Sequence, residues 1–209
     1  MSIPESIPES STPPVRLAEP GETHTMAALL ADAFEQDPVF TFLFPPGTSR
    51  RHKRMTRLFG IDVVRSQRLG GAWTSDDGSA AAVWYPPGQW EPSDRESLRQ
   101  LPQLFAAFGR RLPLAGQVLN ALQEQHRRLD PHWYLYYMGT KADRRSSGVG
   151  SALLQAVLQR SDSEQTPAYL EATSERNRAM YERHGFETRG EIALPGGGPT
   201  MIPMWRSPR

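Results

Sequence analysis

The sequence predicts an α/β fold, because strand patterns alternate with helical patterns along the chain. The run Trp133-Tyr134-Leu135-Tyr136-Tyr137-Met138 is aromatic and apolar, which is typical of a buried strand. A glycine-rich turn follows, and residues 151–160 then carry leucine and valine at helical spacing. Residues 71–74 and 80–85 predict a hairpin, since Asp76-Asp77-Gly78 between them has the residues that such turns prefer.

The first part of the chain predicts a tail, a strand and two helices. Residues 1–14 repeat Ser-Ile-Pro-Glu-Ser and are rich in proline, serine and glutamate, so we expect a disordered tail and one globular domain over residues 15–209. Residues 15–18 alternate as a strand does, a helix begins at residue 22 or 23, and a second helix opens with the basic run 50–54. Their apolar faces hold Met26, Leu29, Leu30, Ala33 and Phe34, then Met55, Leu58 and Ile61.

The later part predicts helices on both sides of the aromatic strand. Two helical stretches between Ser93 and Leu129 are divided near Pro113. After the motif helix, the pattern predicts a strand at 167–173, a helix at 176–184, a strand at 186–194, a turn at 195–199 and a strand at 200–205. Pro203 in the last strand predicts an edge position or a bulge, because proline cannot donate to a β-ladder.

Composition and charge exclude several function classes. With a formal net charge of +1, the chain has no general attraction to nucleic acid or to an anionic membrane. The absence of cysteine excludes disulfides, thiolate metal sites and a cysteine nucleophile. The five histidines have no ligand spacing with carboxylates, so no metal site is expected. No secretion signal or run of membrane length is seen, so we expect a cytoplasmic protein.

The turn Arg145-Ser146-Ser147-Gly148-Val149-Gly150 predicts an anion site. The first turn of a helix has backbone N–H groups without partners and the positive end of the helix dipole. A Walker loop is excluded because Ser151-Ala152 follows the last glycine, where Lys-Ser/Thr is required. A dinucleotide fingerprint is excluded because Leu153 stands where a small residue is needed. The remaining pattern, Arg-x-x-Gly-x-Gly, suits a pyrophosphate.

This motif resembles the acetyl-CoA motif of the GNAT superfamily of N-acetyltransferases. A second signature follows at the expected distance, first Tyr169-Leu170-Glu171-Ala172 and then Asn177-Arg178-Ala179-Met180-Tyr181-Glu182-Arg183-His184-Gly185-Phe186. The hairpin Asp76-Asp77-Gly78-Ser79-Ala80-Ala81-Ala82-Val83-Trp84 is similar to one in the puromycin N-acetyltransferase type, which also has the short span from Asn177 to Tyr181. The resemblance covers residues 15–205.

The resemblance implies a GNAT fold, in which a mixed sheet of six to seven strands is flanked by helices and splayed between the fourth and fifth strands. It implies acetyl-CoA as co-substrate, with the pantetheine arm in the splay and a backbone N–H near Met138 as oxyanion donor. The positions that the family uses for the coenzyme correspond here to Met138, Thr140, Arg145, Ser146, Ser147, Gly148, Val149, Gly150, Ser151 and Asn177.

The same resemblance assigns two catalytic roles. Tyr181 matches a family tyrosine whose phenol protonates the coenzyme thiolate, and the alternative is that it packs the helix against the sheet. Glu171 matches a glutamate that some members use as the base, directly or through water, and the alternative is a structural carboxylate that hydrogen-bonds the following loop. The preceding strand lacks the carboxylate of many relatives, so proton removal is expected to pass through water or to be hardly needed for an amine of low pKa.

The acceptor side is expected to be aromatic. The candidate substrate contacts are Phe40, Phe44, Trp84 and Tyr136, with core packing as the alternative. The expected function is direct transfer of an acetyl group, in a ternary complex, from acetyl-CoA to a primary amine of a small molecule, aminoacyl or antibiotic-like, with a role in antibiotic resistance. The alternatives are a protein or peptide N-acetyltransferase and a non-catalytic acetyl-CoA-binding module. We expect a monomer or a homodimer.

Overall fold

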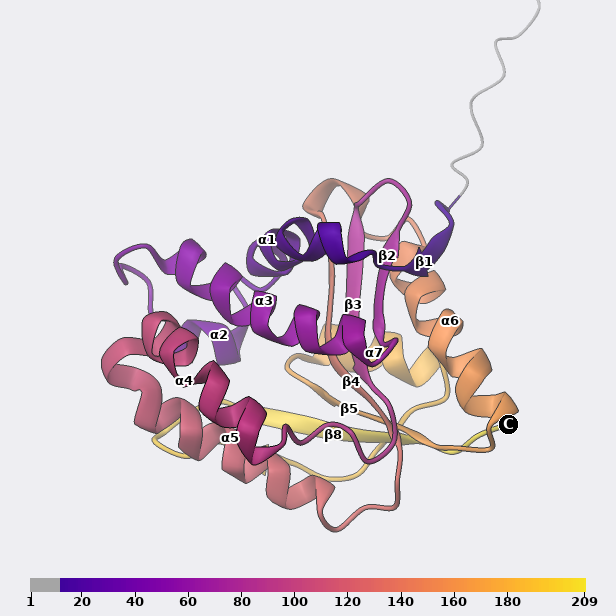
Figure 1. The fold of residues 1–209 in the computed structure, drawn as a ribbon. Coiled ribbons are helices and arrows are strands. Elements are labelled where there is room, and N and C mark those ends of the chain that lie inside the picture. The colour runs from indigo at the N-terminus through magenta and orange to yellow at the C-terminus, as the bar shows by residue number, and fades with distance from the viewer. Residues whose placement is uncertain (1–11) are drawn as a thin grey trace, which may run out of the picture.

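The computed structural model describes residues 12–209, and its centre is a sheet of eight strands (Figure 1). The strands are β1 (Val15–Leu17), β2 (Ala72–Ser75), β3 (Ala80–Tyr85), β4 (Trp133–Thr140), β5 (Ala168–Ala172), β6 (Glu187–Thr188), β7 (Ile192–Ala193) and β8 (Thr200–Arg206). Their order is β1-β2-β3-β4-β5-β8-β6, with β7 also paired to β8, and only the β4–β5 pair is parallel among these strands. Most of the tail predicted for residues 1–14 lies outside the described residues, so that prediction and the domain limits stay predictions.

Helices cover both faces of the sheet. They are α1 (Thr23–Ala33), α2 (Pro38–Leu43), α3 (Arg51–Arg68), α4 (Asp94–Phe108), α5 (Leu112–His126), α6 (Val149–Ser163) and α7 (Glu175–Arg183), with short 3-10 turns at Pro20–Glu22, Gly109–Arg111 and Ala142–Arg144. Side chains alternate along β3, so Val83 and Tyr85 enter the core under α1 to α5, and Ala82 and Trp84 enter the core under α6 and α7. In Figure 1, α1 and α3 lie on one side of the sheet and α6 on the other.

The two helices predicted between Ser93 and Leu129 are α4 and α5. Ser93 caps α4, because its Oγ accepts from the Glu96 N–H and the Glu96 carboxylate accepts from the Ser93 N–H in return. Pro113 lies in the first turn of α5, where the missing N–H costs no hydrogen bond. Within residues 12–209, none of the helices has the length and apolar composition that a bilayer crossing requires.

β4 and β5 diverge toward their C-terminal ends. They pair only where Trp133–Leu135 lies beside Ala168–Leu170, although β4 continues to Thr140 and β5 to Ala172. The sheet is therefore open between the two strands beyond their last pair. This is the splay between the fourth and fifth strands that the GNAT resemblance implies.

The aromatic run at 37–46 contains a short helix, α2, which the sequence pattern did not predict. Asp37 accepts hydrogen bonds from the N–H groups of Val39 at 2.9 Å and Phe40 at 3.2 Å. Pro38 occupies the first helical position, where its fixed φ favours the helix. A cap and a proline thus start a helix too short to show a periodic pattern.

The strand predicted at 186–194 is divided into β6 and β7, which raises the strand count from the expected six or seven to eight. Between the last pair of β6 and the first pair of β7, residues 189–191 lie opposite Ile202 and Pro203, three residues against two. One extra residue on one of two paired strands defines a β-bulge. β8 lies between β5 and β6, so Pro203 marks a bulge and not a sheet edge.

Candidate active site

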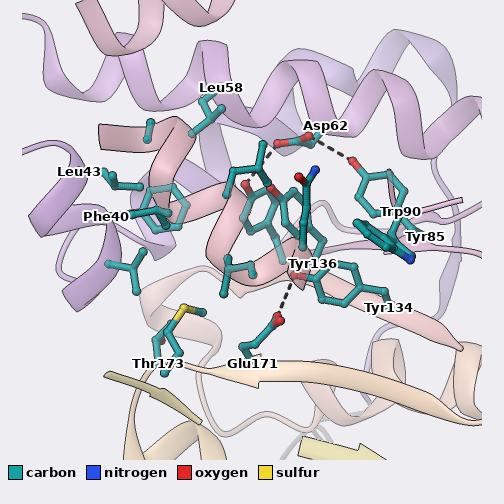
Figure 2. Close-up of a pocket in the computed structure, with 18 of the residues that line it drawn as sticks. Phe40, Leu43, Leu58, Asp62, Tyr85, Trp90, Tyr134, Tyr136, Glu171 and Thr173 are labelled. Atoms are coloured by element: carbon teal, nitrogen blue, oxygen red, sulfur yellow. Dashed lines mark hydrogen bonds between the residues drawn. The ribbon is translucent and has the colours of Figure 1, made fainter. Parts of the chain in front are cut away.

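A cavity of about 230 Å³ lies where β4 and β5 diverge, and helices α2 to α5 together with α7 border it (Figure 2). Its wall includes the segments of both strands beyond their last pair, residues 136–138 and 171–173. Most of the remaining wall is apolar or aromatic, and its acidic groups are Asp62 and Glu171. Such a cavity suits a small organic molecule that carries a cationic group.

A β-bulge in β4 turns three tyrosines toward this cavity. Two successive residues of β3 pair with Leu135 and Tyr137, so Tyr136 is an extra residue in β4. Tyr134, Tyr136 and Tyr137 therefore all line the cavity, whereas strict alternation places neighbours on opposite faces. The bulge also falls where the coenzyme resemblance places the pantetheine arm.

Glu171 extends from β5 into the cavity with a side chain that is only 3% exposed. The Tyr134 hydroxyl donates to its Oε2 at 2.8 Å (Figure 2), and His126 Nε2 lies 3.4 Å from its Oε1. Its strand neighbours Leu170 and Ala172 belong to the core beneath α6. His126 was missed by the sequence analysis, because no local pattern connects the end of α5 with β5.

Asp62 is the second carboxylate of the cavity, and the sequence analysis missed it. The hydroxyl groups of Tyr85 and Tyr137 donate to it at 3.1 and 3.2 Å (Figure 2). Burial raises the pKa of Asp62 to about 7. The sequence signal that could have found Asp62 is its spacing, since it lies at helical distance from Met55 and Leu58 on the apolar face of α3.

Tyr181 comes from α7 and reaches the same cavity. It is 8% exposed, and its ring packs against Phe186 with 6.0 Å between centroids. Burial raises the pKa of Tyr181, and the Asp37 carboxylate adds to the effect, so the phenol keeps its proton at neutral pH. Asn177 also lines the cavity, and its N–H donates to the Ser174 Oγ that caps α7. Tyr181 therefore packs α7 against the sheet and also forms part of the cavity wall.

The glycine-rich turn forms the start of α6 beside the end of β4. Gly148 is the N-cap with a φ of 87°, a left-handed conformation that favours glycine. The first three amides of α6 precede the first intrahelical hydrogen bond, which the fourth helical residue donates to Gly148. A Cβ on Gly150 would lie 3.9 Å from Thr140 and 4.0 Å from Met138, so the turn borders the end of β4. Free amides at a helix start fit a pyrophosphate.

The other residues expected at the coenzyme surround this turn. Arg145 and Ser146 are exposed, and Val149 is buried beneath the turn. Ser147 Oγ donates to the carbonyl oxygen of Arg144 at 2.7 Å. Ser151 Oγ lies 3.1 Å from Nε2 of His184, the C-cap residue of α7. Within residues 12–209, no group of three or more histidine, aspartate or glutamate side chains is arranged to hold a metal ion.

The structure places two of the four expected acceptor contacts in the cavity wall and two outside it. Phe40 and Tyr136 line the cavity, but Phe44 stacks on Phe108 with 4.9 Å between centroids and is not part of the wall. Trp84 is fully buried in the core beneath α6, on the opposite face of the sheet. Its place corrects the expectation, because side chains alternate along β3 and the following tyrosine faces the cavity instead.

Comparison with known proteins agrees with this fold. A sequence profile described as an acetyltransferase (GNAT) domain matches residues 114–188. An uncharacterized N-acetyltransferase of Schizosaccharomyces pombe is 29% identical over 180 residues, which cover 80% of this chain and 72% of the relative. A Corynebacterium glutamicum structure described as histone acetyltransferase HPA2 and related acetyltransferase is 26% identical with a TM-score of 0.70, covering 95% of this chain and 98% of that one. The polyamine N-acetyltransferase of Drosophila melanogaster shares the fold at 16% identity and a TM-score of 0.61, with coverage of 92% and 98%.

The splayed strands, the glycine-rich start of α6 and these relatives define the class, acetyltransferases of the GNAT fold, a family that uses acetyl-CoA as co-substrate. Residues 114–188 match the GNAT acetyltransferase profile, and the described chain has the fold of GNAT N-acetyltransferases. These relatives support the superfamily and give no specific support to the puromycin type.

Proposed function

We propose that this enzyme transfers the acetyl group of acetyl-CoA to the primary amine of a small molecule with an aromatic or apolar skeleton. The observation that carries the proposal is the position of the cavity. Its wall contains both splayed strand segments and two buried carboxylates, so an acceptor amine in the cavity lies beside the opening expected to hold the thioester.

In this proposal, acetyl-CoA lies along the open edge of β4. The free amides at the start of α6 bind the pyrophosphate, and backbone groups at Met138 and Thr140 pair with the pantetheine arm. The coenzyme supplies an activated acetyl group as a thioester. A backbone N–H near Met138 stabilises the oxyanion that forms when the amine attacks.

Proton transfer in the proposal uses two residues of the cavity wall, Glu171 from β5 and Tyr181 from α7. Glu171 accepts the proton of the incoming ammonium, because its Oε1 has no hydrogen-bond partner among residues 12–209 and its carboxylate is enclosed by the cavity. Tyr181 donates its phenolic proton to the departing thiolate, since burial keeps the phenol protonated. When ionised, Asp62 adds negative charge on the other side of the cavity and favours a cationic acceptor.

The acceptor class is the finer part of the proposal. The tyrosines of β4 and Phe40 give the cavity an aromatic wall that suits an arylalkylamine or an aminoacyl amine. The Drosophila relative is described as a polyamine N-acetyltransferase that forms N-acetylagmatine, which makes polyamines and agmatine acceptors to test. The hairpin resemblance to the puromycin type makes puromycin a further acceptor to test.

A protein or peptide acetyltransferase is the second candidate, because the Corynebacterium structure is described in part as a histone acetyltransferase. A peptide needs an open groove, whereas this cavity is bordered by five helices and holds only about 230 Å³. Small amines therefore remain the first choice. The non-catalytic alternative is less favoured, because the profile that matches residues 114–188 and the relative at 29% identity are both described as acetyltransferases.

The test combines binding with turnover. Thermal shift with acetyl-CoA, CoA and ATP is expected to show stabilisation by the two CoA species alone. Thiol release is then measured with arylalkylamines, polyamines, agmatine, puromycin and a lysine-containing peptide. We expect turnover with at least one small amine, and loss of it by about 10²-fold in E171Q but not in the exposed control E175Q. Turnover of the peptide alone would contradict the proposal.

A further inference from the structure

Two buried histidines form a line of polar contacts behind Glu171. His126 ends α5 and His132 precedes β4, and they are 3% and 2% exposed. His132 Nδ1 lies 2.7 Å from the carbonyl oxygen of Asp130, and His132 Nε2 lies 3.0 Å from His126 Nδ1. His126 Nε2 then lies 3.4 Å from Glu171 Oε1. The line joins the cavity to an exposed residue of the loop before β4.

These contacts determine which ring nitrogens carry hydrogen. A carbonyl oxygen only accepts, so His132 Nδ1 carries the hydrogen that the Asp130 carbonyl receives. Burial lowers the pKa of His132 to about 4, so its ring is neutral at neutral pH and its Nε2 has a free lone pair. His126 Nδ1 must then donate to that lone pair. As a result, Nε2, the nitrogen that faces Glu171, carries no hydrogen when the His126 ring is neutral.

The atoms at this end of the line lack partners. His126 Nε2, Glu171 Oε1 and the Tyr169 hydroxyl are buried without a hydrogen bond among residues 12–209. The ring of Tyr169 packs edge-on against the ring of His126 with 4.9 Å between centroids. The ring of Trp90 stacks on the same histidine ring with 4.6 Å between centroids. Buried polar atoms without partners cost stability, and a catalytic role is one reason for a protein to keep them.

We infer that His126 works with Glu171 as the base for the acceptor amine, and that His132 is the positioning residue that turns the His126 Nε2 lone pair toward Glu171. The inference rests on the proposed function, since it names the destination of the acceptor's proton.

The proton is accounted for at each atom. An N–H bond of the acceptor ammonium breaks, its electron pair stays on the nitrogen, and the proton passes through Glu171 Oε1 to His126 Nε2. The amine becomes neutral and nucleophilic. The His126 ring becomes a cation whose two N–H groups face His132 Nε2 and the Glu171 carboxylate, so both the charge and the donors are satisfied.

The test uses two substitutions of His132 that separate its two hydrogen bonds. In H132Q, the side-chain oxygen takes the place of Nε2 and still accepts from His126 Nδ1. In H132N, the side-chain amide takes the place of Nδ1 and keeps the bond to Asp130, but His126 loses its acceptor. Exposed His24 gives the control H24N. The acetyl-CoA thermal shift is measured for every variant to verify the fold and the coenzyme site.

Two acceptors of nearly equal shape, 2-phenylethylamine and its 2,2-difluoro analogue, distinguish a base from a structural role. The fluorinated amine is far less basic and arrives already neutral. For 2-phenylethylamine we expect H132N to lower kcat/KM by about 10²-fold and H132Q by less than about 5-fold. For the fluorinated amine, H132N is expected to lower it by less than about 3-fold. An equal loss with both amines would overturn the inference.

A second readout does not depend on turnover. Nitrogen-15 spectra of the histidine rings are expected to show hydrogen on Nδ1 of both His126 and His132, with assignments from H126Q and H132Q. Hydrogen on Nε2 alone in neutral His126 would overturn the inference even if amines are acetylated. If no small amine is acetylated, the proposed function fails, and these spectra still decide the arrangement of the two rings.

Discussion

Replacing Asp62 by asparagine should change how the stability of this protein depends on pH. Burial raises the pKa of Asp62 from 3.8 to about 7, and the unfolded chain returns it to its ordinary value. The folded state therefore holds a proton on Asp62 that the unfolded state releases between about pH 4 and 7. The stability that this group contributes is complete below pH 4 and is lost as the pH rises through 7.

The size of the effect on the free energy of unfolding follows from the difference between the folded and unfolded pKa values of Asp62. About three pH units correspond to roughly 4 kcal/mol over the whole range, of which about 3 kcal/mol falls between pH 5 and pH 8. Asparagine keeps an oxygen that accepts from Tyr85 or Tyr137 but cannot ionise. The free energy of unfolding of D62N, relative to wild type, should therefore rise by roughly 3 kcal/mol from pH 5 to pH 8.

Urea unfolding at pH 5, 6, 7 and 8 measures this difference, with the exposed Asp143 replaced in a control, D143N. Comparing variants at each pH removes the contributions of all other carboxylates, which the proteins share. If D62N and D143N gave the same difference from wild type at every pH, Asp62 would ionise normally in the folded protein. The argument from its burial would then be wrong.

Three further outcomes follow from other contacts. Y181F should lower kcat by about 10²-fold while acetyl-CoA still raises the Tm as in wild type, and an unchanged kcat would leave Tyr181 a packing residue. G139A brings a Cβ within 2.7 Å of the Ala33 Cβ in α1, so thermal unfolding should show a loss of about 1–3 kcal/mol, and no loss would mean that α1 moves freely. R206M removes the two 2.8 Å hydrogen bonds to Asp162, which is 28% exposed, and should cost about 1–3 kcal/mol at pH 7. Arg206 lowers the pKa of Asp162, so this cost should shrink as urea unfolding is repeated below about pH 4, and a constant cost would exclude the ion pair as its source.

Local sequence was enough where neighbouring residues decide the structure. The strand, glycine-rich turn and helix from Trp133 to Ser163 follow from side-chain period and from the freedom of glycine, and the structure has all three. The hairpin of β2 and β3 follows from its turn residues in the same way. The GNAT resemblance, carried by these motifs, gave the splayed sheet and the N-acetyltransferase class.

Packing between distant elements decided the rest of the site. Asp62 from α3 and His126 from α5 meet the cavity only after the helices pack on the sheet, and neither lies in a motif. Trp84 was expected in the cavity but lies beneath α6, because the face of a strand residue depends on its register with the neighbouring strand.

The sequence by itself determined most of the order of elements, the glycine-rich turn at the start of α6 and the resemblance to GNAT acetyltransferases, because each depends on residues close together in the chain. Only the tertiary structure decided that the bulge at Tyr136 turns three tyrosines to one side and that two histidines stand behind Glu171. The physical reason is that side-chain direction and proton position are set by partners across the sheet, and those partners are far apart in the sequence.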